Sequence, residues 1–487
     1  MYNFLFYFLI EVFGVIFMIL SFSVILVYLL IMIFSALEMR DYRRKNRFID
    51  YQDIITSPLA PGVSIIAPAF NEEATIVNNV KSLLSLHYGK FEVIIVNDGS
   101  RDNTLQKLIN AFQLQKTEFF YYSEIKTQAI RGVYRSENKS FRRLTIIDKE
   151  NGGKADALNA GINISQMEIL ACIDVDCILS SDSITRMVRP FMEETNKKVI
   201  AVGGAIGIAN NCDIKDGTVT TYRVPESAIG RFQVVEYCRA FLMGRMAWSR
   251  INGLMLISGA FGFFKKDIVL AVGGYFPNTV GEDMELVVRM RRYMQEKRIP
   301  YRVGFVPDPL CWTEVPEDEK VLERQRNRWM RGTIETLQLH QKIGLKPRYG
   351  ILGMVSFPFW TVFEKLAPIL EIIGLLYTLT LLILGDFSVV YFIALLLMIY
   401  LLSMLVSTFS VLFEQLAFNN YKNKKDLYRL IGTILLEPIM IHPKIVWWGL
   451  KGHIDFIIGR GGWGKMIRTG FKSAEERKNL DSQSIAS

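Results

Sequence analysis

Acidic side chains follow several short apolar stretches of this chain, at the point where each stretch ends. Asp98 closes "FEVIIVND", and Asp174 and Asp176 follow "EILACI". Two aspartates at positions i and i+2 can face one hard cation, and Mg²⁺ or Mn²⁺ held by one or two carboxylates usually completes its shell with water and substrate phosphates. A D-x-D pattern alone is more often a solvated turn, but the apolar residues before it favour a site for Mg²⁺ or Mn²⁺.

A second acidic pair, Glu282 and Asp283, follows Gly281 and opens an amphipathic stretch with helical spacing. Carboxylates at this position can simply cap a helix, because its first turn carries unpaired backbone N–H groups. Transfer of a group to a hydroxyl, however, requires a base that is separate from the metal site on the leaving group. Two acidic sites far apart in sequence therefore favour a catalytic role for the second pair.

These residues need a scaffold that brings them together, and the middle of the chain predicts one. Residues 62–70 and 91–98 are short β-branched apolar runs, and residues 71–86 between them have helical spacing. The alternation continues through residues 143–179, which predicts a mostly parallel sheet with helices on both faces. Ligands of such sheets bind beyond the carboxyl ends of the strands, where the polar clusters of this chain fall.

The rest of the chain is too apolar for one soluble domain, since 50% of its 487 residues are hydrophobic. Residues 4–34 carry Glu11 as their only charge and exceed the roughly 20 residues that cross a bilayer. The basic stretch "MRDYRRKNR" follows, and such flanks lie on the cytoplasmic side of a membrane. The sequence therefore predicts one long, tilted span with the N-terminus outside the cell.

Two further apolar stretches, residues 366–385 and 388–413, predict a transmembrane hairpin, and the basic residues 419–429 after it are cytoplasmic by charge. Residues 345–364 are expected to form an interfacial helix. Within residues 430–450, Glu437, His442 and Pro443 favour an interfacial or re-entrant segment over a span. We therefore predict three spans, with four as the alternative.

Cysteine usage and charge indicate the compartment and the partners of the protein. The five cysteines are scattered and lack a C-x-x-C pair, which argues against disulfides and a zinc site and fits a reduced cytosolic domain. Much of the net charge of +9 lies at the membrane-flanking segments and around residues 325–332. This distribution favours contact with the lipid bilayer and with a phosphate-bearing ligand, so nucleic acid is not an expected partner.

Six motifs of the chain resemble those of the processive family 2 glycosyltransferases, the group of cellulose, hyaluronan, chitin and poly-N-acetylglucosamine synthases. In order, they are "NDGSRDNT", "GGKADALNAG", "DVD", "SGAFG", "GED" and "QRNRW". Each is weak alone, whereas six in this order are specific, and Q-x-x-R-W is the most specific of them. The resemblance implies a cytosolic α/β domain of the GT-A (Rossmann-like) fold, combined with transmembrane and interfacial helices.

With that fold, the chain is expected to divide into seven regions. These are an N-terminal transmembrane helix (1–38), a basic cytosolic linker (39–59), the GT-A domain (60–340), an interfacial amphipathic helix (345–364), a transmembrane hairpin (365–414), a cytosolic loop with an interfacial or re-entrant helix and the "GGWGK" segment (415–472), and a disordered tail (473–487).

The resemblance also implies which residues bind the donor, a UDP-sugar. Asp98 would contact uracil, and Lys154 the ribose or diphosphate. Asp174 and Asp176 would hold Mg²⁺ or Mn²⁺ at the diphosphate. The remaining donor residues would be Glu73, Arg328, Lys465 and Arg468.

By the same resemblance, Asp283 would be the catalytic base, with Glu282 beside it. It would take the proton of an acceptor hydroxyl that attacks the anomeric carbon, so the configuration of the sugar would be inverted. Trp329 would stack its ring on a sugar of the acceptor, which is a growing polysaccharide. The other acceptor residues would be Ser258, Gly259 and Gln325.

The chain departs from the family pattern at three places. Asn97 stands where the first of two aspartates is usual, and Gly281 replaces the threonine of the T-E-D motif. The gating motif F-x-V-T-x-K has no clear match. Instead "GRGGWGKMIRTGF" is similar to the W-G-T motif of hyaluronan synthases. Trp463, Lys465 and Arg468 are therefore expected either to close over the diphosphate or to form a basic segment on the membrane surface.

The function predicted from these observations is an inverting, processive membrane glycosyltransferase that polymerises a β-linked polysaccharide from a UDP-sugar and translocates it. It is expected as a multi-pass protein of the plasma membrane with a cytoplasmic catalytic domain, regulated, if at all, through an accessory subunit. UDP-glucose is slightly preferred as the donor, giving a β-glucan such as cellulose or a mixed-linkage glucan.

Three alternatives stay open at this stage. One is a synthase of the hyaluronan or poly-N-acetylglucosamine type, and another is a single transfer to a lipid acceptor. The third is a transporter or channel with a nucleotide-sensing domain and no chemistry, which predicts many spans lined by polar residues. The predicted spans are few and nearly free of charge, which disfavours the third.

Overall fold

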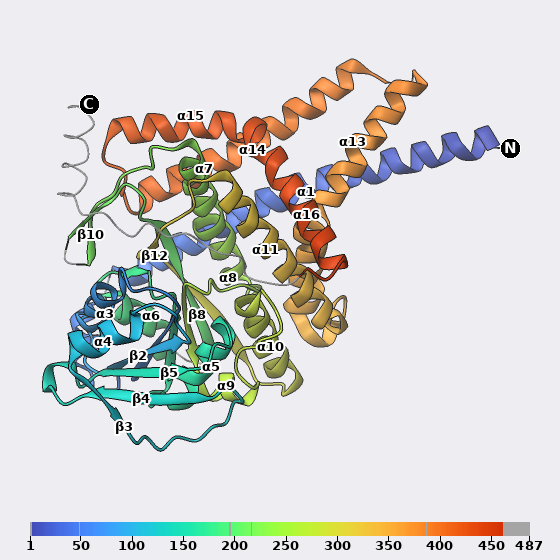
Figure 1. Ribbon diagram of the computed structural model, residues 1–487. Helices are drawn as coiled ribbons and strands as arrows, with labels where there is room; N and C mark the ends of the chain where they lie inside the picture. Colours follow the sequence, from blue (N-terminus) through green and yellow to red (C-terminus); the bar gives the residue numbers. More distant parts are fainter. Residues whose placement is uncertain (1, 48, 194–195, 216, 386, 461–487) are drawn as a thin grey trace.

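The structure, a computed structural model, describes residues 2–47, 49–193, 196–215, 217–385 and 387–460. Figure 1 shows an α/β domain at the lower left and a group of long helices above it and to its right. The first helix, α1 (Tyr2–Asn46), and the hairpin of α13 (Ala367–Leu384) and α14 (Val389–Ala417) project away from the α/β domain.

The α/β domain is built on a ten-stranded sheet with the order β3-β4-β5-β2-β1-β6-β11-β8-β12-β7. Its four central strands, β5, β2, β1 and β6, are parallel neighbours, as the alternating pattern predicts. The strands β8 and β12 also pair in parallel, as predicted, but β11 runs antiparallel to both β6 and β8 and β4 runs antiparallel to β5, so the sheet as a whole is mixed. The strands are β1 (Val63–Ala69), β2 (Phe91–Asp98), β3 (Leu114–Thr117), β4 (Ile130–Ser136), β5 (Leu144–Lys149), β6 (Ile169–Ile173), β7 (Ile178–Leu179), β8 (Lys198–Ile208), β11 (Phe261–Lys265) and β12 (Tyr301–Thr313).

Helices cover the sheet because each presents an apolar stripe to it. In α3 (Ile76–Leu84), the buried residues Ile76, Val80 and Leu83 recur at helical spacing, and every residue of β2 is buried beneath the covering helices. The other helices of the domain are α2 (Tyr51–Thr56), α4 (Thr104–Phe112), α5 (Lys154–Ile164), α6 (Ser183–Met192), α7 (Ala228–Tyr237), α8 (Met246–Arg250), α9 (Lys266–Ala271), α10 (Glu282–Glu296) and α11 (Glu319–Leu339). A π-helical segment, η2 (Cys238–Arg245), joins α7 to α8, and β9 (Asp213–Lys215) pairs with β10 (Thr218–Thr221) in a small second sheet.

The helix α1 continues through much of the basic stretch expected to be a linker. It ends at Asn46 rather than near residue 38, because its last turns dock on the α/β domain. Arg250 donates to Asp41 Oδ2 at 3.0 Å, and the Tyr42 hydroxyl donates to the carboxylate of Asp308 on β12. The first helix and the catalytic domain are therefore joined by side-chain contacts as well as by the chain.

Within the described residues, three helices are long and apolar enough to cross a membrane: Glu11–Asn46, Ala367–Leu384 and Val389–Ala417. A fourth span results only if α15 (Lys424–Met440) and α16 (His442–Ile457), which meet at an angle of 51°, are counted as one bent segment. The break lies at Ile441, directly before His442 and Pro443, and His442 Nε2 lies 2.9 Å from Glu371 Oε2 on α13. The structure thus agrees with the prediction of three spans and also allows the four-span alternative.

The segment expected to be an interfacial helix is helical but irregular. Short turns η3 (Gln341–Ile343) and η4 (Pro347–Tyr349) precede two π-helical stretches, η5 (Leu352–Ser356) and η6 (Trp360–Lys365), with α12 (Phe357–Phe359) between them. Pro358 lies at the junction, and its missing N–H explains the interruption of regular α-helical bonding.

Candidate active site

The candidate site lies where the central parallel strands end. Asp98 is the last residue of β2, and Asp174 follows β6 directly, with β1 between these two strands. Two helices begin beside this edge: Lys154 opens α5, and Glu282 opens α10. Because the N-terminus of a helix carries a partial positive charge, this edge suits an anionic ligand.

Lys154 is the residue around which the site is arranged. Its Nζ lies 2.5 Å from Asp174 Oδ1 and 3.8 Å from Glu282 Oε1, and it donates to the carbonyl oxygen of Gly259 at 3.3 Å. Burial lowers the pKa of this ammonium, but Asp174 and Glu282 together raise it above its usual value. Lys154 is therefore a permanent positive charge between the two acidic clusters that the sequence analysis singled out.

Asp283 and Lys154 are both held by the backbone of Gly259. Gly259 N donates to Asp283 Oδ2 at 3.0 Å, while Gly259 O accepts from Lys154. A Cβ at Gly259 would lie 3.1 Å from Lys154 Nζ and 3.4 Å from the Asp283 side chain, so the close packing favours glycine here. Ser258 accepts a hydrogen bond from Phe261 N at 3.1 Å through its carbonyl oxygen, which closes the turn that presents Gly259.

Glu282 is almost completely buried beside the base candidate. Burial, with a smaller contribution from the charge of Asp283, raises the pKa of its carboxyl to about 7 against the opposing effect of Lys154. Only 4% of Glu282 is exposed, which is why burial is the largest cause. The two adjacent acids of the "GED" motif therefore have different environments.

Two arginines, Arg328 and Arg245, add positive charge beside the acidic residues of the site. Arg328 on α11 interacts with Glu282, Asp174 and Asp283, although burial lowers the pKa of its guanidinium. Arg245, the last residue of η2, lies 4.0 Å over the ring of Phe241 and interacts with Asp283; burial lowers its pKa to about 10. Sequence reasoning missed Arg245, because it belongs to none of the six motifs.

The Q-x-x-R-W motif lies on α11 and faces partly outward. Trp329 is 42% exposed, and the guanidinium of Arg326 lies 4.1 Å over its ring, so one ring face is covered. Arg326 in turn donates to Glu236 Oε2 at 2.6 Å. Gln325 Oε1 is buried without a hydrogen-bond partner among the described residues, which leaves an acceptor suited to a hydroxyl group.

The residues present also fit a divalent cation. One ligand atom each of Asp174, Asp176 and Cys177 lies within 4.8 Å of the others, among the described residues. The two carboxylates match the preference of Mg²⁺ and Mn²⁺ for oxygen ligands. Cys177 was considered in the sequence only as a reduced thiol, and its place beside the D-x-D pair was not predicted.

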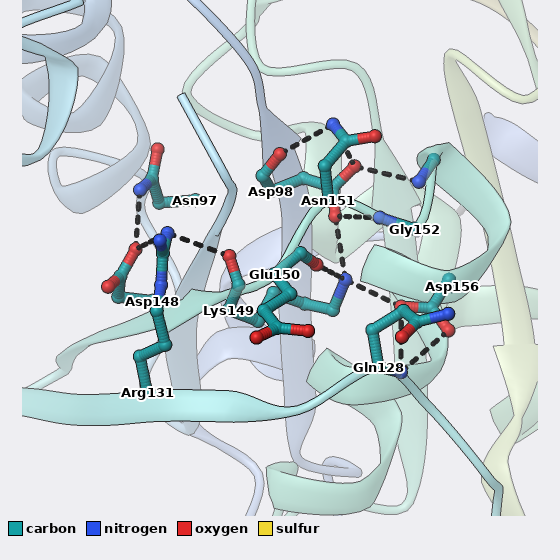
Figure 2. A network of polar contacts seen from close by, with 11 residues as sticks. Asn97, Asp98, Gln128, Arg131, Asp148, Lys149, Glu150, Asn151, Gly152 and Asp156 are labelled. Carbon is teal, nitrogen blue, oxygen red and sulfur yellow. Dashed lines mark hydrogen bonds and ion pairs between the residues drawn. The ribbon is translucent and has the colours of Figure 1, made fainter. Parts of the chain in front are cut away.

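Asp98, the predicted uracil contact, accepts hydrogen bonds from the protein at both carboxylate oxygens. Its Oδ1 accepts from Lys149 Nζ at 2.7 Å and from Gly152 N at 3.0 Å (Figure 2). Its Oδ2 accepts from Gly153 N at 2.8 Å and from Asn151 Nδ2 at 3.2 Å. A carboxylate offers about four lone-pair positions, so Asp98 is saturated by the loop that leads into Lys154.

Lys149, at the end of β5, is the centre of this network. Its side chain is completely buried and lies 2.7 Å from Asp98 Oδ1 and 2.5 Å from Asp156 Oδ1 (Figure 2). It also donates to the carbonyl oxygen of Glu150 at 2.5 Å, so all three of its N–H groups are used. Lys149 thus fixes the loop 150–153 and, through it, the start of α5; the sequence analysis did not single it out.

The remaining predicted residues are placed as follows. Glu73 lies after β1, and its described hydrogen bonds join residues 102–107: Oε2 accepts from Asn103 N at 3.1 Å, and its carbonyl oxygen accepts from Lys107 Nζ at 3.0 Å. Asn97, in place of the usual first aspartate, donates to Asp148 Oδ1 at 2.7 Å. Trp463, Lys465 and Arg468 lie outside the described residues.

A mixed α/β sheet whose edge gathers acidic side chains around a lysine and an arginine is the arrangement of a GT-A glycosyltransferase. Two family models match the chain: "Glycosyl transferase family 2" over residues 64–247 and "Glycosyl transferase family group 2" over residues 169–409. The chain belongs to family 2 of the glycosyltransferases, as the six motifs predict.

Among curated proteins, the chain is similar to poly-beta-1,6-N-acetyl-D-glucosamine synthases. It is 28% identical to that of Staphylococcus epidermidis over 276 residues, which cover 57% of this chain and 55% of the relative. It is also 28% identical to that of Staphylococcus aureus (strain COL) over 318 residues, which cover 65% of this chain and 64% of the relative. The matches thus span between about half and two thirds of these relatives' length.

Two solved structures resemble the chain at low identity. One is the mannosyltransferase PcManGT from Pyrobaculum calidifontis in complex with GDP-Man and Mn²⁺, with a TM-score of 0.47, 14% identity, and coverage of 89% of this chain and 99% of the other. The other is residues 1–349 of S. aureus TarS in complex with UDP-GlcNAc, with a TM-score of 0.38, 14% identity, and coverage of 63% and 74%.

Proposed function

We propose that this protein transfers N-acetylglucosamine from UDP-N-acetylglucosamine to the end of a growing β-linked polysaccharide at the cytoplasmic face of a membrane. The observation that carries the proposal is the arrangement around Gly259, whose N–H holds Asp283 while its carbonyl oxygen holds Lys154. This places a carboxylate and a cation next to each other at the backbone of one residue. Such a pair suits a reaction that needs a base at one end and a charged leaving group at the other.

Asp283 is the proposed base. It accepts the proton of the acceptor hydroxyl while the oxygen of that hydroxyl forms a bond to the anomeric carbon of the donor sugar. The bond between this carbon and the diphosphate oxygen breaks, and UDP leaves with the electron pair. Attack from the face opposite the leaving group converts an α-linked donor into a β-linked product. The hydrogen bond from Gly259 N keeps Oδ2 oriented for this step.

Lys154 and Arg328 are the proposed partners of the diphosphate. Both cations lie beside Asp174 and Glu282. When a phosphate group enters the site, its oxygens replace these carboxylates as partners of the two cations. Asp174 and Asp176 would hold Mg²⁺ or Mn²⁺, with Cys177 next to them. A bound divalent cation would supply further positive charge for the departing diphosphate.

Asp98 is proposed to act on the nucleotide indirectly. Because its four acceptor positions are occupied, a uracil N–H would have to replace one of the donors from the loop 150–153. We therefore assign Asp98 and Lys149 the role of shaping this loop, which presents Lys154 to the donor. Glu73 is assigned to the neighbouring loop that it caps.

Trp329 and Gln325 are the proposed acceptor residues. With Arg326 over one face of the indole, the exposed remainder of the ring is left for a sugar, and Gln325 Oε1 can accept from a sugar hydroxyl. Both lie on α11, which packs against α16. We infer a multi-pass location in the plasma membrane with an outward path for the product.

The choice of N-acetylglucosamine replaces the sequence-based preference for UDP-glucose. No motif of the chain reads the sugar directly, and the curated relatives at 28% identity carry names that specify a poly-N-acetylglucosamine product. The preference for a glucan such as cellulose has no corresponding support. Of the alternatives stated from the sequence, the poly-N-acetylglucosamine type is the one we propose.

The test is a donor panel. Purified full-length protein in liposomes, with Mg²⁺ or Mn²⁺, is given UDP-N-acetylglucosamine, UDP-glucose or UDP-glucuronate separately, and released UDP is measured. We expect release with UDP-N-acetylglucosamine alone. Release with UDP-glucose alone would restore the glucan assignment, and release only after addition of a lipid acceptor would favour a single transfer.

A further inference from the structure

Two glycines bring the base-bearing helix into backbone contact with the helix of the tryptophan motif. Gly281 immediately precedes α10, and Gly332 lies in the middle of α11. A Cβ at Gly281 would lie 2.7 Å from Gly332 Cα, and a Cβ at Gly332 would lie 2.7 Å from Gly281 Cα. Non-bonded atoms this close would clash, so neither position accepts a side chain while the two helices keep their present separation.

A glutamate on α11 holds the same segment by two hydrogen bonds. Glu335 Oε2 accepts from the Thr279 hydroxyl at 2.7 Å and from Val280 N at 2.9 Å. The Thr279 oxygen in turn accepts from Gly281 N at 3.1 Å. We name Thr279, Val280, Gly281, Gly332 and Glu335 the α10–α11 clamp.

A second contact lies one turn further along α10. His340 Nε2 lies 3.1 Å from Glu285 Oε1, and both residues are buried. The clamp fixes the segment directly before α10 and this pair fixes its first turn, so the two helices cannot slide past each other without breaking both contacts. A packed contact between glycine backbones is rigid, because it contains no rotatable side chain.

We propose, on the basis of the proposed function, that the clamp sets the distance between the base and the acceptor, and that Glu335 is a positioning residue for transfer. Asp283 lies two residues after Gly281, whereas Trp329 lies three residues before Gly332 and Arg328 lies one helical turn before it. The clamp therefore joins the base to the acceptor motif through a few backbone bonds. A loosened clamp leaves Lys154, Asp174 and Asp176 of the donor site in place but admits water to the place of the acceptor hydroxyl.

The predicted consequence is a change in the fate of the donor. In transfer, the acceptor oxygen bonds to the anomeric carbon and UDP leaves. In hydrolysis, a water oxygen forms that bond, its proton passes to Asp283, and UDP leaves together with free sugar. The ratio of sugar in polymer to UDP released measures how often the acceptor is in place, and a residue that only supports the fold does not change this ratio.

The experiment compares Glu335→Ala with Glu335→Gln, using the full-length protein in liposomes and the donor that is active with wild-type protein. We expect Glu335→Ala to lower the rate of polymer formation about tenfold or more, since small misplacements of reacting groups are costly. The ratio of polymer sugar to UDP should fall, whereas KM for the donor should change less than the rate does, because Lys154, Asp174 and Asp176 lie outside the clamp. Glu335→Gln keeps an oxygen that accepts from Thr279 and Val280, so it should retain most of the activity.

Gly332→Ala is the second variant, because it opens the contact without altering charge, and Gln338→Ala, exposed on the same helix, is the matched control. Gly332→Ala should lower the ratio as Glu335→Ala does, and Gln338→Ala should not. The proposal is overturned if both clamp variants keep the wild-type ratio, or if their rates fall only with the folded fraction measured by thermal unfolding. A wild-type protein that releases no UDP from any donor would instead contradict the proposed function.

Discussion

Lys154 Nζ lies 2.5 Å from Asp174 Oδ1, so the first residue of α5 is paired with the first carboxylate after β6. The same ammonium lies 3.8 Å from Glu282 Oε1 at the start of α10. Three segments that are far apart in the sequence therefore meet at one cation. In the absence of that cation, the acidic groups would repel one another across a partly buried site.

Replacement of Lys154 by methionine tests this arrangement. Loss of the ammonium leaves Asp174 and Glu282 without their shared partner and removes a group that stabilises the diphosphate, so both donor affinity and turnover should fall. A loss of roughly 100-fold or more in kcat/KM is expected for a charged group at a leaving anion. UDP release and UDP binding measured by calorimetry report the two effects. Lys154→Arg keeps the charge and should be less impaired; equal activity of Lys154→Met and wild type would exclude the role.

Asp283→Asn should abolish transfer and spare donor binding. The amide oxygen can still accept from Gly259 N, so the local geometry is kept, but an amide cannot take a proton from the acceptor. Loss of a general base costs about 100- to 10,000-fold in rate. Polymer formation and binding of UDP, measured side by side, give the result. Turnover near the wild-type rate in this variant would remove the assignment of the base.

Lys149→Met should destabilise the protein rather than change its chemistry alone. The side chains of Lys149, Asp98 and Asp156 are 0%, 5% and 8% exposed, so removal of the cation leaves two buried carboxylates facing each other. Breaking a buried ion pair from one side costs about 3 to 5 kcal/mol. Chemical unfolding of the protein in detergent measures the loss.

The matched control for Lys149→Met is Arg131→Gln. Arg131 pairs with Asp148 at 2.9 Å in the same network, but its side chain is 48% exposed (Figure 2). Its loss should cost less than about 1 kcal/mol, because exposed ion pairs contribute little. Equal unfolding curves for the two variants would show that the burial of Lys149 does not matter.

The stability of the folded protein should change with pH because Glu282 titrates. Burial raises the pKa of its carboxyl from the ordinary 4.5 to about 7, so the folded protein holds this proton more tightly than the unfolded chain does. The stabilisation is fully present below about pH 4.5 and is lost as the pH rises to about 7. Glu282→Gln has no proton to lose.

Melting temperatures of wild type and Glu282→Gln, measured from pH 4.5 to 8, check this expectation. The variant should gain stability relative to wild type as the pH rises to about 7, and the difference should then stay constant. A difference between the two proteins that does not change with pH would show that Glu282 titrates normally in the folded state.

Local patterns of the sequence predicted the central strands, the covering helices and the spans, because these depend on short-range periodicity. They also placed Asp98 and Asp174 at one edge, since the carboxyl ends of parallel strands meet there. Lys154 was predicted only through the resemblance to the family. The end of α1 was missed by several residues. Its continuation depends on contacts of Asp41 and Tyr42 with Arg250 and Asp308, which are remote in sequence.

The site residues that the sequence did not predict, Lys149 and Arg245, are also positioned by long-range contacts. Lys149 is one basic residue among many until β5 pairs with β2, and its network joins residues from 98 to 156. Arg245 follows an apolar stretch without a motif, and its approach to Asp283 arises from the fold of η2 against the sheet. The identity of the donor sugar could not be predicted from the sequence either, because a pocket selects the sugar by its shape.

Product analysis tests the central claim most directly. Wild-type protein in liposomes is incubated with radiolabelled UDP-N-acetylglucosamine and Mg²⁺ or Mn²⁺, with Asp283→Asn as the control, and the product is sized and digested with linkage-specific glycosidases. We predict a high-molecular-weight polymer that a hexosaminidase specific for β-linked N-acetylglucosamine degrades, and no product from the variant. Label that stays in small lipid-linked molecules, or a polymer formed equally by Asp283→Asn, would contradict the account.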